Sequence, residues 1–101
     1  RGQWRQFRRG LIAAMLNDYN RKLSGGQMPA NYHHDDAQYI DGKLSMIGIE
    51  ERGKLCSAYA KSYRDAYAAE PNEVRKDGKA RREANTRLRE YINRKFLRKM
   101  G

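Results

Sequence analysis

At 101 residues the chain is large enough for one domain, and its apolar content of 39% lies below the roughly 45–50% of ordinary globular domains. Its longest apolar run, residues 11–16, is far shorter than the about 20 residues that cross a bilayer, so no membrane partner is expected. The single Cys56 excludes an intrachain disulfide and a Cys-based metal site, and it fits a reducing environment, so we expect a cytoplasmic protein.

Positive charge is concentrated at the two ends of the chain. Residues 1–23 carry six Lys and Arg against one Asp, a net charge of +5, and residues 24–74 carry five against eight, or −3. Residues 75–101 carry eleven against three, or +8, and the total is +10. Such segregation favours association with nucleic acid or another anionic surface.

The opening residues, 1–23, are predicted to form an amphipathic helix. Apolar side chains recur there at three- and four-residue steps, as on the packed face of a helix: Trp4, Phe7, Leu11, Met15, Tyr19 and Leu23. Residues 24–34 contain Gly25, Gly26 and other turn-forming residues, so we predict a loop.

Residues 35–70 are predicted to form two helices. Asp35 or Asp36 is the expected N-cap of the first, and Gly48 is expected to end it. Glu50 opens the second, which stops before Pro71 because a residue that precedes proline is pushed out of helical geometry. The expected buried positions are Ala37, Ile40, Leu44 and Ile47 in the first helix and Leu55, Cys56, Tyr59, Ser62, Tyr63 and Ala66 in the second.

The row Tyr59, Tyr63 and Tyr67 is placed at the edge of the core, with a subunit interface as the alternative. Residues 71–78 form a loop or one helical turn, and residues 79–100 form a long basic helix. The expected fold is therefore all-α: a single domain over residues 1–101, built as a small bundle of four to five helices. A homodimer would supply apolar contacts that the thin core lacks.

The final helix carries the main functional signal. Arg82, Thr86, Arg89 and Asn93 share one row of its polar face, and further cations crowd its start, where the helix dipole disfavours them. Lys and Arg bind phosphates, and Arg and Asn also read base edges. The expected nucleic-acid-binding residues are Arg75, Lys76, Lys79, Arg81, Arg82, Thr86, Arg89, Asn93 and Arg94. The alternative is a solvated helix surface, since Glu83 with Arg87 and Glu90 with Arg94 are favourable i, i+4 pairs.

The stretch YHHDD, residues 32–36, combines two imidazoles and two carboxylates. A small metal-dependent nuclease that uses His33, Asp35 and Asp36 is therefore one hypothesis. Adjacent side chains in one loop rarely converge on one ion, and a helix cap already explains the two aspartates. We accordingly expect no metal site, no cofactor and no enzymatic activity, and we expect Asp41 and Asp65 to be surface carboxylates.

Several features occur in the same order as in a known family. They are Trp4 in a basic opening segment, Asp35-Asp36-Ala37 opening a helix that continues to Ile40 and Leu44, the spaced set Arg52, Leu55, Tyr59 and Tyr63, and NTRLREYI at residues 85–92. In these the chain resembles small phage and prophage regulators of the late-gene antiterminator (Q) group.

That resemblance implies a DNA-reading helix-turn-helix like that of sigma-factor region four in the last two helices. It places Arg82, Asn85, Thr86 and Arg89 at recognition-helix contacts. Residues 66–83 depart from the family pattern, because they lack the compact first helix and the glycine turn of such a unit.

The leading hypothesis is thus a non-enzymatic, basic nucleic-acid-binding protein, with DNA favoured over RNA and a phage-type transcription regulator as its most specific form. The alternative is a phage-type interaction module that binds an acidic face of a host protein.

Overall fold

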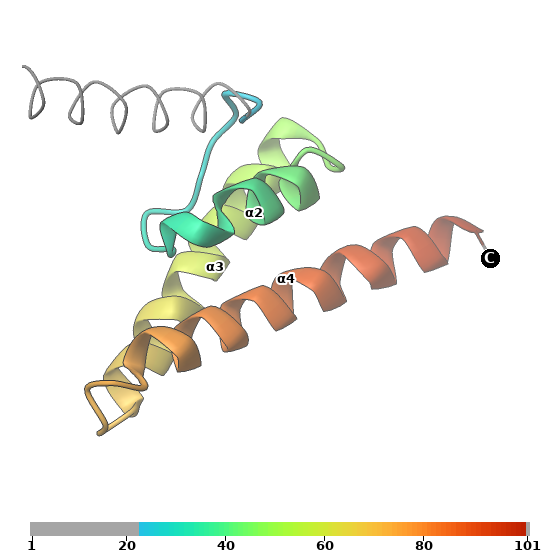
Figure 1. The fold of residues 1–101 in the computed structure, drawn as a ribbon. Coiled ribbons are helices and arrows are strands. Elements are labelled where there is room, and N and C mark those ends of the chain that lie inside the picture. Colours follow the sequence, from blue (N-terminus) through green and yellow to red (C-terminus); the bar gives the residue numbers. More distant parts are fainter. Residues whose placement is uncertain (1–22, 101) are drawn as a thin grey trace, which may run out of the picture.

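Three α-helices and one short 3₁₀ turn make up the part of the chain that the structure describes, residues 23–100 of a computed structural model (Figure 1). In chain order they are η1 (His34–Asp36), α2 (Ala37–Leu44), α3 (Ile49–Ala69) and α4 (Lys76–Met100). The all-α class is confirmed. The described residues contain three α-helices rather than the expected four to five, and the helix predicted over residues 1–23 falls outside them except for its last residue. None of the helices within residues 23–100 has both the length and the apolarity of a membrane span.

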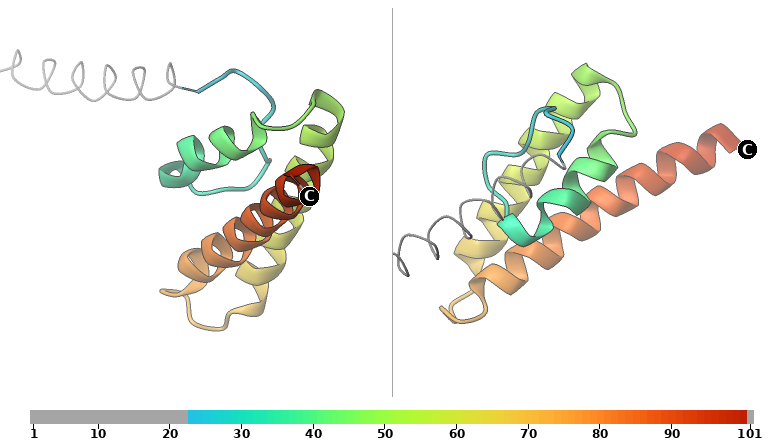
Figure 2. Two further views of the ribbon diagram at one scale, coloured as in Figure 1. Left: turned by 90° about the vertical axis from the view of Figure 1, so that its right-hand side faces the viewer. Right: turned by 45° about the horizontal axis from the view of Figure 1, so that its top comes forward.

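The two long helices, α3 and α4, form an antiparallel pair joined by the turn at residues 70–75 (Figures 1 and 2). Pro71 holds Glu70 in extended backbone (φ −84°, ψ 117°), which ends α3 at Ala69 as predicted. The Asn72 side chain then accepts a hydrogen bond from the Val74 N–H at 3.0 Å. Helix α4 begins at Lys76 rather than at the predicted residue 79. Asp77 lies in its first turn, where a carboxylate suits the helix dipole.

The core lies where α2 packs against the α3–α4 pair. Its buried members are Ile40 and Leu44 of α2, Cys56 and Tyr59 of α3, and Ala84, Leu88 and Ile92 of α4. Ile40 and Leu44 are fully buried, which stabilises the fold by about 1.5–3 kcal/mol for each side chain. The buried positions predicted for the two helices of residues 35–70 are thus largely confirmed, with Ile47, Leu55, Ser62, Tyr63 and Ala66 half-buried at their margins.

Two local predictions need correction or refinement. Gly48 does not end α2, which stops at Leu44; instead Gly48 is the extended N-cap residue of α3. The row Tyr59, Tyr63 and Tyr67 runs outward from the core, which agrees with its predicted place at the core edge. Tyr59 is buried, Tyr63 is half-buried, and Tyr67 is exposed, with the Lys76 ammonium 5.2 Å from its ring.

Candidate nucleic-acid interface

One face of α4 carries most of the residues predicted to bind nucleic acid. Buried Ala80, Ala84, Leu88 and Ile92, four residues apart, fix the rotation of α4 against the core. The opposite side therefore faces solvent, and we call its residues the outer row: Lys79, Arg82, Thr86, Arg89 and Asn93. All of them are exposed except Thr86, which is half-buried. The row extends about 20 Å along the helix axis.

The cations of the outer row keep their charge unpaired within the described structure. Lys79, Arg82 and Arg89 form no ion pair or side-chain hydrogen bond with any residue of the described range. Together with Glu83 and Thr86 these three line a surface hollow of about 650 Å³. This part of the molecule therefore offers several positive groups to one ligand.

The acidic residues of α4 lie outside the outer row. Glu83 pairs with Arg87 at 3.3 Å along one edge of the helix. Asp77 accepts a hydrogen bond from the Tyr63 hydroxyl at 3.5 Å on the side that faces α3. Glu90 borders a hollow between α3 and α4. The i, i+4 ion pair between Glu83 and Arg87, typical of a solvated helix surface, thus lies along one edge of α4 and outside the outer row.

Three predicted binding residues occupy other positions. The Arg81 guanidinium donates two hydrogen bonds to the Asp36 carboxylate, at 2.8 and 2.9 Å. The Lys76 ammonium donates to the backbone carbonyls at the end of α3, those of Tyr67 at 3.0 Å and Glu70 at 2.6 Å. Arg94 borders the hollow between α3 and α4 instead of joining the outer row. Arg75 is exposed in the turn that leads directly into the row.

Asp36 anchors the turn before α2 to α4. In addition to Arg81, it accepts a hydrogen bond from the Asn85 amide at 3.0 Å, while the Asn85 carbonyl accepts one from the Tyr59 hydroxyl at 2.5 Å. The Arg81 hydrogen bonds hold the pKa of Asp36 below its ordinary value despite partial burial, and burial raises the pKa of Tyr59. Asp36 makes no side-chain cap to α2, contrary to the prediction, and the cap of η1 comes from His33.

Asp41, predicted to be a surface carboxylate, is instead 6% exposed and paired with Arg52, which is 7% exposed. The Arg52 guanidinium donates to Asp41 Oδ1 at 2.8 Å and to the Gln27 carbonyl at 2.8 Å. The Ser24 N–H and hydroxyl also donate to Asp41, at 2.8 and 2.6 Å. This network fastens the loop before η1 onto α2 and α3.

The electrostatics of Asp41 follow from these contacts. Burial acts to raise the pKa of Asp41, but the hydrogen bonds from Ser24 and Arg52 outweigh it and hold the pKa below the ordinary value. The Arg52 guanidinium packs closely against Gly26, because a Cβ on Gly26 would lie 2.5 Å from the Arg52 Cζ. An alanine there would push the guanidinium away from its partner.

Asp36 and Asp41 make the stability of the fold sensitive to acid. Both have a folded-state pKa below the unfolded value of about 3.9, so folding favours their charged forms. Their stabilisation is fully present above the unfolded pKa and is lost as the pH falls through the folded pKa values. We expect the free energy of unfolding, measured by urea denaturation and circular dichroism, to fall below about pH 4.

Asp36→Asn should make that fall shallower, because it removes one of the two titrating groups, while Asp65→Asn on the exposed side of α3 should leave it unchanged. An Asp36→Asn variant with the same acid dependence as the parent protein would contradict this assignment.

A hollow of about 330 Å³ lies between α3 and α4 and is the main alternative binding surface. Its floor is largely small or apolar and its rim is charged. It is lined by Leu55, Ala58, Tyr59 and Ser62 of α3 and by Ala84, Arg87, Leu88, Glu90, Tyr91 and Arg94 of α4. The mixed charge of the rim distinguishes this α3–α4 hollow from the outer row.

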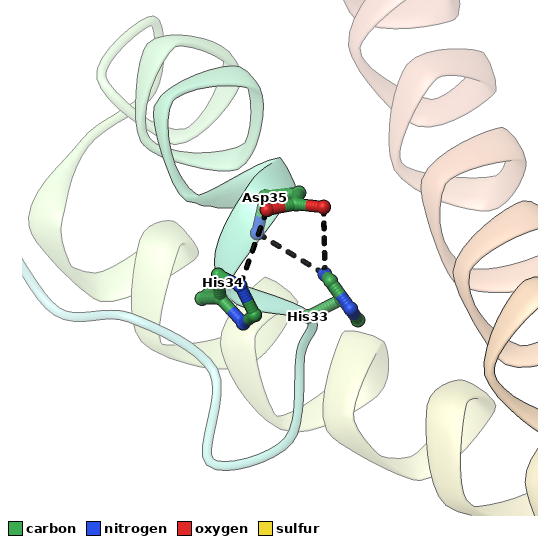
Figure 3. Close-up of side chains that lie close together, drawn as sticks. All are labelled: His33, His34 and Asp35. Carbon is green, nitrogen blue, oxygen red and sulfur yellow. Dashed lines mark hydrogen bonds and ion pairs between the residues drawn. The ribbon is translucent and has the colours of Figure 1, made fainter.

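His33, the N-cap residue of η1, and His34 lie against Asp35 (Figure 3). The His33 and His34 rings stack with their centroids 4.4 Å apart, and a nitrogen of each faces the Asp35 carboxylate. One ligand atom from each of these three adjacent residues thus lies within 4.8 Å of the others. Asp36 is turned toward Arg81 and Asn85, so the set His33, Asp35 and Asp36 of the nuclease hypothesis is not brought together.

Comparison with family models, with curated proteins and with solved structures finds no match for this chain. The resemblance to late-gene antiterminators therefore stays a prediction. Of the residues that it placed at recognition-helix contacts, Arg82, Thr86 and Arg89 lie in the outer row. Asn85 instead bridges Tyr59 and Asp36.

Proposed function

We propose that this protein binds duplex DNA through the outer row of α4. The observation that carries the proposal is the contrast between cations on the same helix. Arg81, Arg87 and Lys95 are paired with Asp36, Glu83 and Glu51. Lys79, Arg82 and Arg89 have no such partner in the described range, and Glu83, the acid that lines the same hollow, is paired with Arg87. Exposed cations on one straight face match a ligand with regularly spaced negative charges.

Duplex DNA fits the shape of this face. Its major groove, about 12 Å wide, admits an α-helix, whereas the major groove of A-form RNA is deep and narrow. The outer row also contains no aromatic side chain on which an unpaired base could stack. DNA is therefore a better ligand for this face than duplex RNA or single strands.

The residues of the row have distinct roles in this proposal. Arg82 and Arg89 are the central contacts, while Arg75 and Lys79 bind phosphates near the start of α4. Thr86 lies between Arg82 and Arg89, and Asn93 lies one turn beyond Arg89. In the proposal both side chains reach base edges. A cytoplasmic transcription regulator of phage type is the most specific form of the proposal.

A salt titration of binding to a random duplex tests the proposal. Four phosphate contacts, by Arg75, Lys79, Arg82 and Arg89, give an affinity that falls about a hundredfold between 50 and 200 mM salt. Fluorescence anisotropy of a labelled duplex measures the affinity at each salt concentration. No affinity at low salt, or an affinity that salt leaves unchanged, would contradict the proposal.

The α3–α4 hollow favours a second candidate, a module that binds another protein. Arg87 and Arg94 on the rim suit an acidic segment of a host protein, and Ala58 and Leu88 offer an apolar floor. Under this candidate generic duplex binding is weak, and Ala58→Arg, which fills the hollow, abolishes partner binding. The same variant leaves duplex affinity intact if the outer row is the binding surface.

A further inference from the structure

The η1 turn gathers three metal-ligand groups on the protein surface. Figure 3 shows the stacked imidazoles of His33 and His34 lying against the carboxylate of Asp35. His33 Nδ1 is 3.7 Å from Asp35 Oδ2, and His34 Nε2 is 3.2 Å from Asp35 Oδ1. One ligand atom from each residue falls within 4.8 Å of the others. We propose that His33, His34 and Asp35 form a binding site for a divalent transition metal such as Zn²⁺.

The spacing of these atoms suits an ion of this size. Zinc lies about 2.0–2.1 Å from imidazole nitrogen and about 2.0–2.2 Å from carboxylate oxygen, so tetrahedral ligand atoms are about 3.4 Å apart. His33 Nδ1 is 3.7 Å from one oxygen of the Asp35 carboxylate and His34 Nε2 is 3.2 Å from the other, so the side chains must turn to bring one oxygen to the tetrahedral distance from both nitrogens. The His34 side chain is 80% exposed, so its ring can turn without disturbing the core.

The chemistry of the group selects the class of metal. Two imidazoles with one carboxylate suit zinc, copper or nickel, whereas magnesium and calcium prefer all-oxygen sites. Three protein ligands leave a fourth tetrahedral position for water or for a group from another molecule. The site therefore takes a transition metal with an open coordination position.

Metal binding competes with the cap of the turn. His33 Nδ1 accepts a hydrogen bond from the Asp35 N–H at 3.1 Å, so its lone pair already points toward the turn. A bound ion takes that lone pair, and the Asp35 N–H, on an exposed residue, is then satisfied by water. The ion cannot take the place of the Asp35 N–H, so metal binding requires the His33 ring to turn away from that group and breaks the cap of the turn.

The composition of the chain makes this site unusually easy to test. His33 and His34 are its only histidines, and its only cysteine, Cys56, is buried. Any imidazole-dependent metal binding by the full chain must therefore come from His33 and His34. Calorimetric titration with Zn²⁺ should give one site per chain, and Co²⁺ should give the visible absorption bands of a tetrahedral complex.

Two variants separate metal binding from folding. His34→Ala removes one ligand and leaves the cap intact. His33→Asn keeps a side-chain oxygen that accepts the Asp35 N–H but loses the nitrogen ligand. Each should weaken Zn²⁺ binding by at least about tenfold and abolish the Zn²⁺-induced rise in unfolding temperature seen for the parent.

Asp65→Asn, which removes an exposed carboxylate of α3, is the control and should bind Zn²⁺ like the parent. The proposal is overturned if the parent binds no Zn²⁺, or if both histidine variants bind as tightly as the parent. It is independent of DNA binding, which uses a different surface.

Discussion

Replacing Arg82 and Arg89 together with alanine is expected to weaken duplex binding on the order of a hundredfold at moderate salt. Each guanidinium contact to a phosphate or a base edge contributes about 1–3 kcal/mol, and losing two contacts should lower the salt slope by about 2. Both side chains are exposed and unpaired in the described range, so their removal leaves the fold intact. Fluorescence anisotropy from 50 to 200 mM salt gives both the affinity and the slope.

The matched control removes the same charge from another helix. Lys54→Ala/Arg64→Ala lowers the net charge equally but changes exposed positions on α3. Its affinity should stay within about threefold of the parent value, because bulk charge alone is a weak, screened contribution. Equal losses for the two double variants would mean that net charge, and not the outer row, determines binding.

Replacing Asp41 with alanine is expected to lower the free energy of unfolding by about 3–5 kcal/mol, because it leaves the buried Arg52 guanidinium without its acidic partner. That is a large share of the about 5–15 kcal/mol that stabilises a typical domain. Urea denaturation at pH 7, followed by circular dichroism, measures the change. Asp65→Ala, which removes only an exposed i, i+4 pair with Lys61, should cost less than about 1 kcal/mol.

A double variant shows how much of this loss comes from the unpaired charge. Asp41→Leu/Arg52→Met replaces both partners with apolar side chains and should cost less than Asp41→Ala alone. If Asp41→Ala were no more destabilising than Asp65→Ala, the loop before η1 would not depend on the buried pair.

The helices and their core faces could be predicted because they depend on local periodicity. The stripe from Ala37 to Leu44 and the row from Ala80 to Ile92 follow the helical repeat, and Pro71 marks a boundary through its own geometry. The outer row followed from the same reasoning, since a helix with one buried stripe must expose the opposite side.

The ion pairs could not be predicted in this way, because they join residues that are distant in sequence. Asp36 and Arg81 are 45 positions apart, and nothing local links them. A weaker signal was present for Asp41 and Arg52. Each lies on the apolar stripe of its own helix, Asp41 next to Ile40 and Arg52 four residues before Cys56. Charges of opposite sign on two facing stripes indicate a buried pair.

For the same reason, the sequence could not show which cations of α4 are held by other residues. Arg81 and Arg82 are neighbours in sequence with the same chemistry, yet the first is fixed by Asp36 and the second faces solvent. Their different surroundings follow from the rotation of α4 against the core, which turns Arg81 toward Asp36 and Arg82 toward solvent. Helical periodicity therefore located the outer row, whereas the ion pair that holds Arg81 could not be predicted from the sequence.

Mapping the duplex on the protein by nuclear magnetic resonance tests the central claim most directly. A ¹⁵N-labelled full chain titrated with a short random duplex should show its largest amide and side-chain shifts at Lys79, Arg82, Thr86, Arg89 and Asn93. Residues that line the α3–α4 hollow from α3, such as Ala58 and Ser62, should change little. Shifts confined to that hollow or to residues 1–22, with the outer row unchanged, would contradict the account.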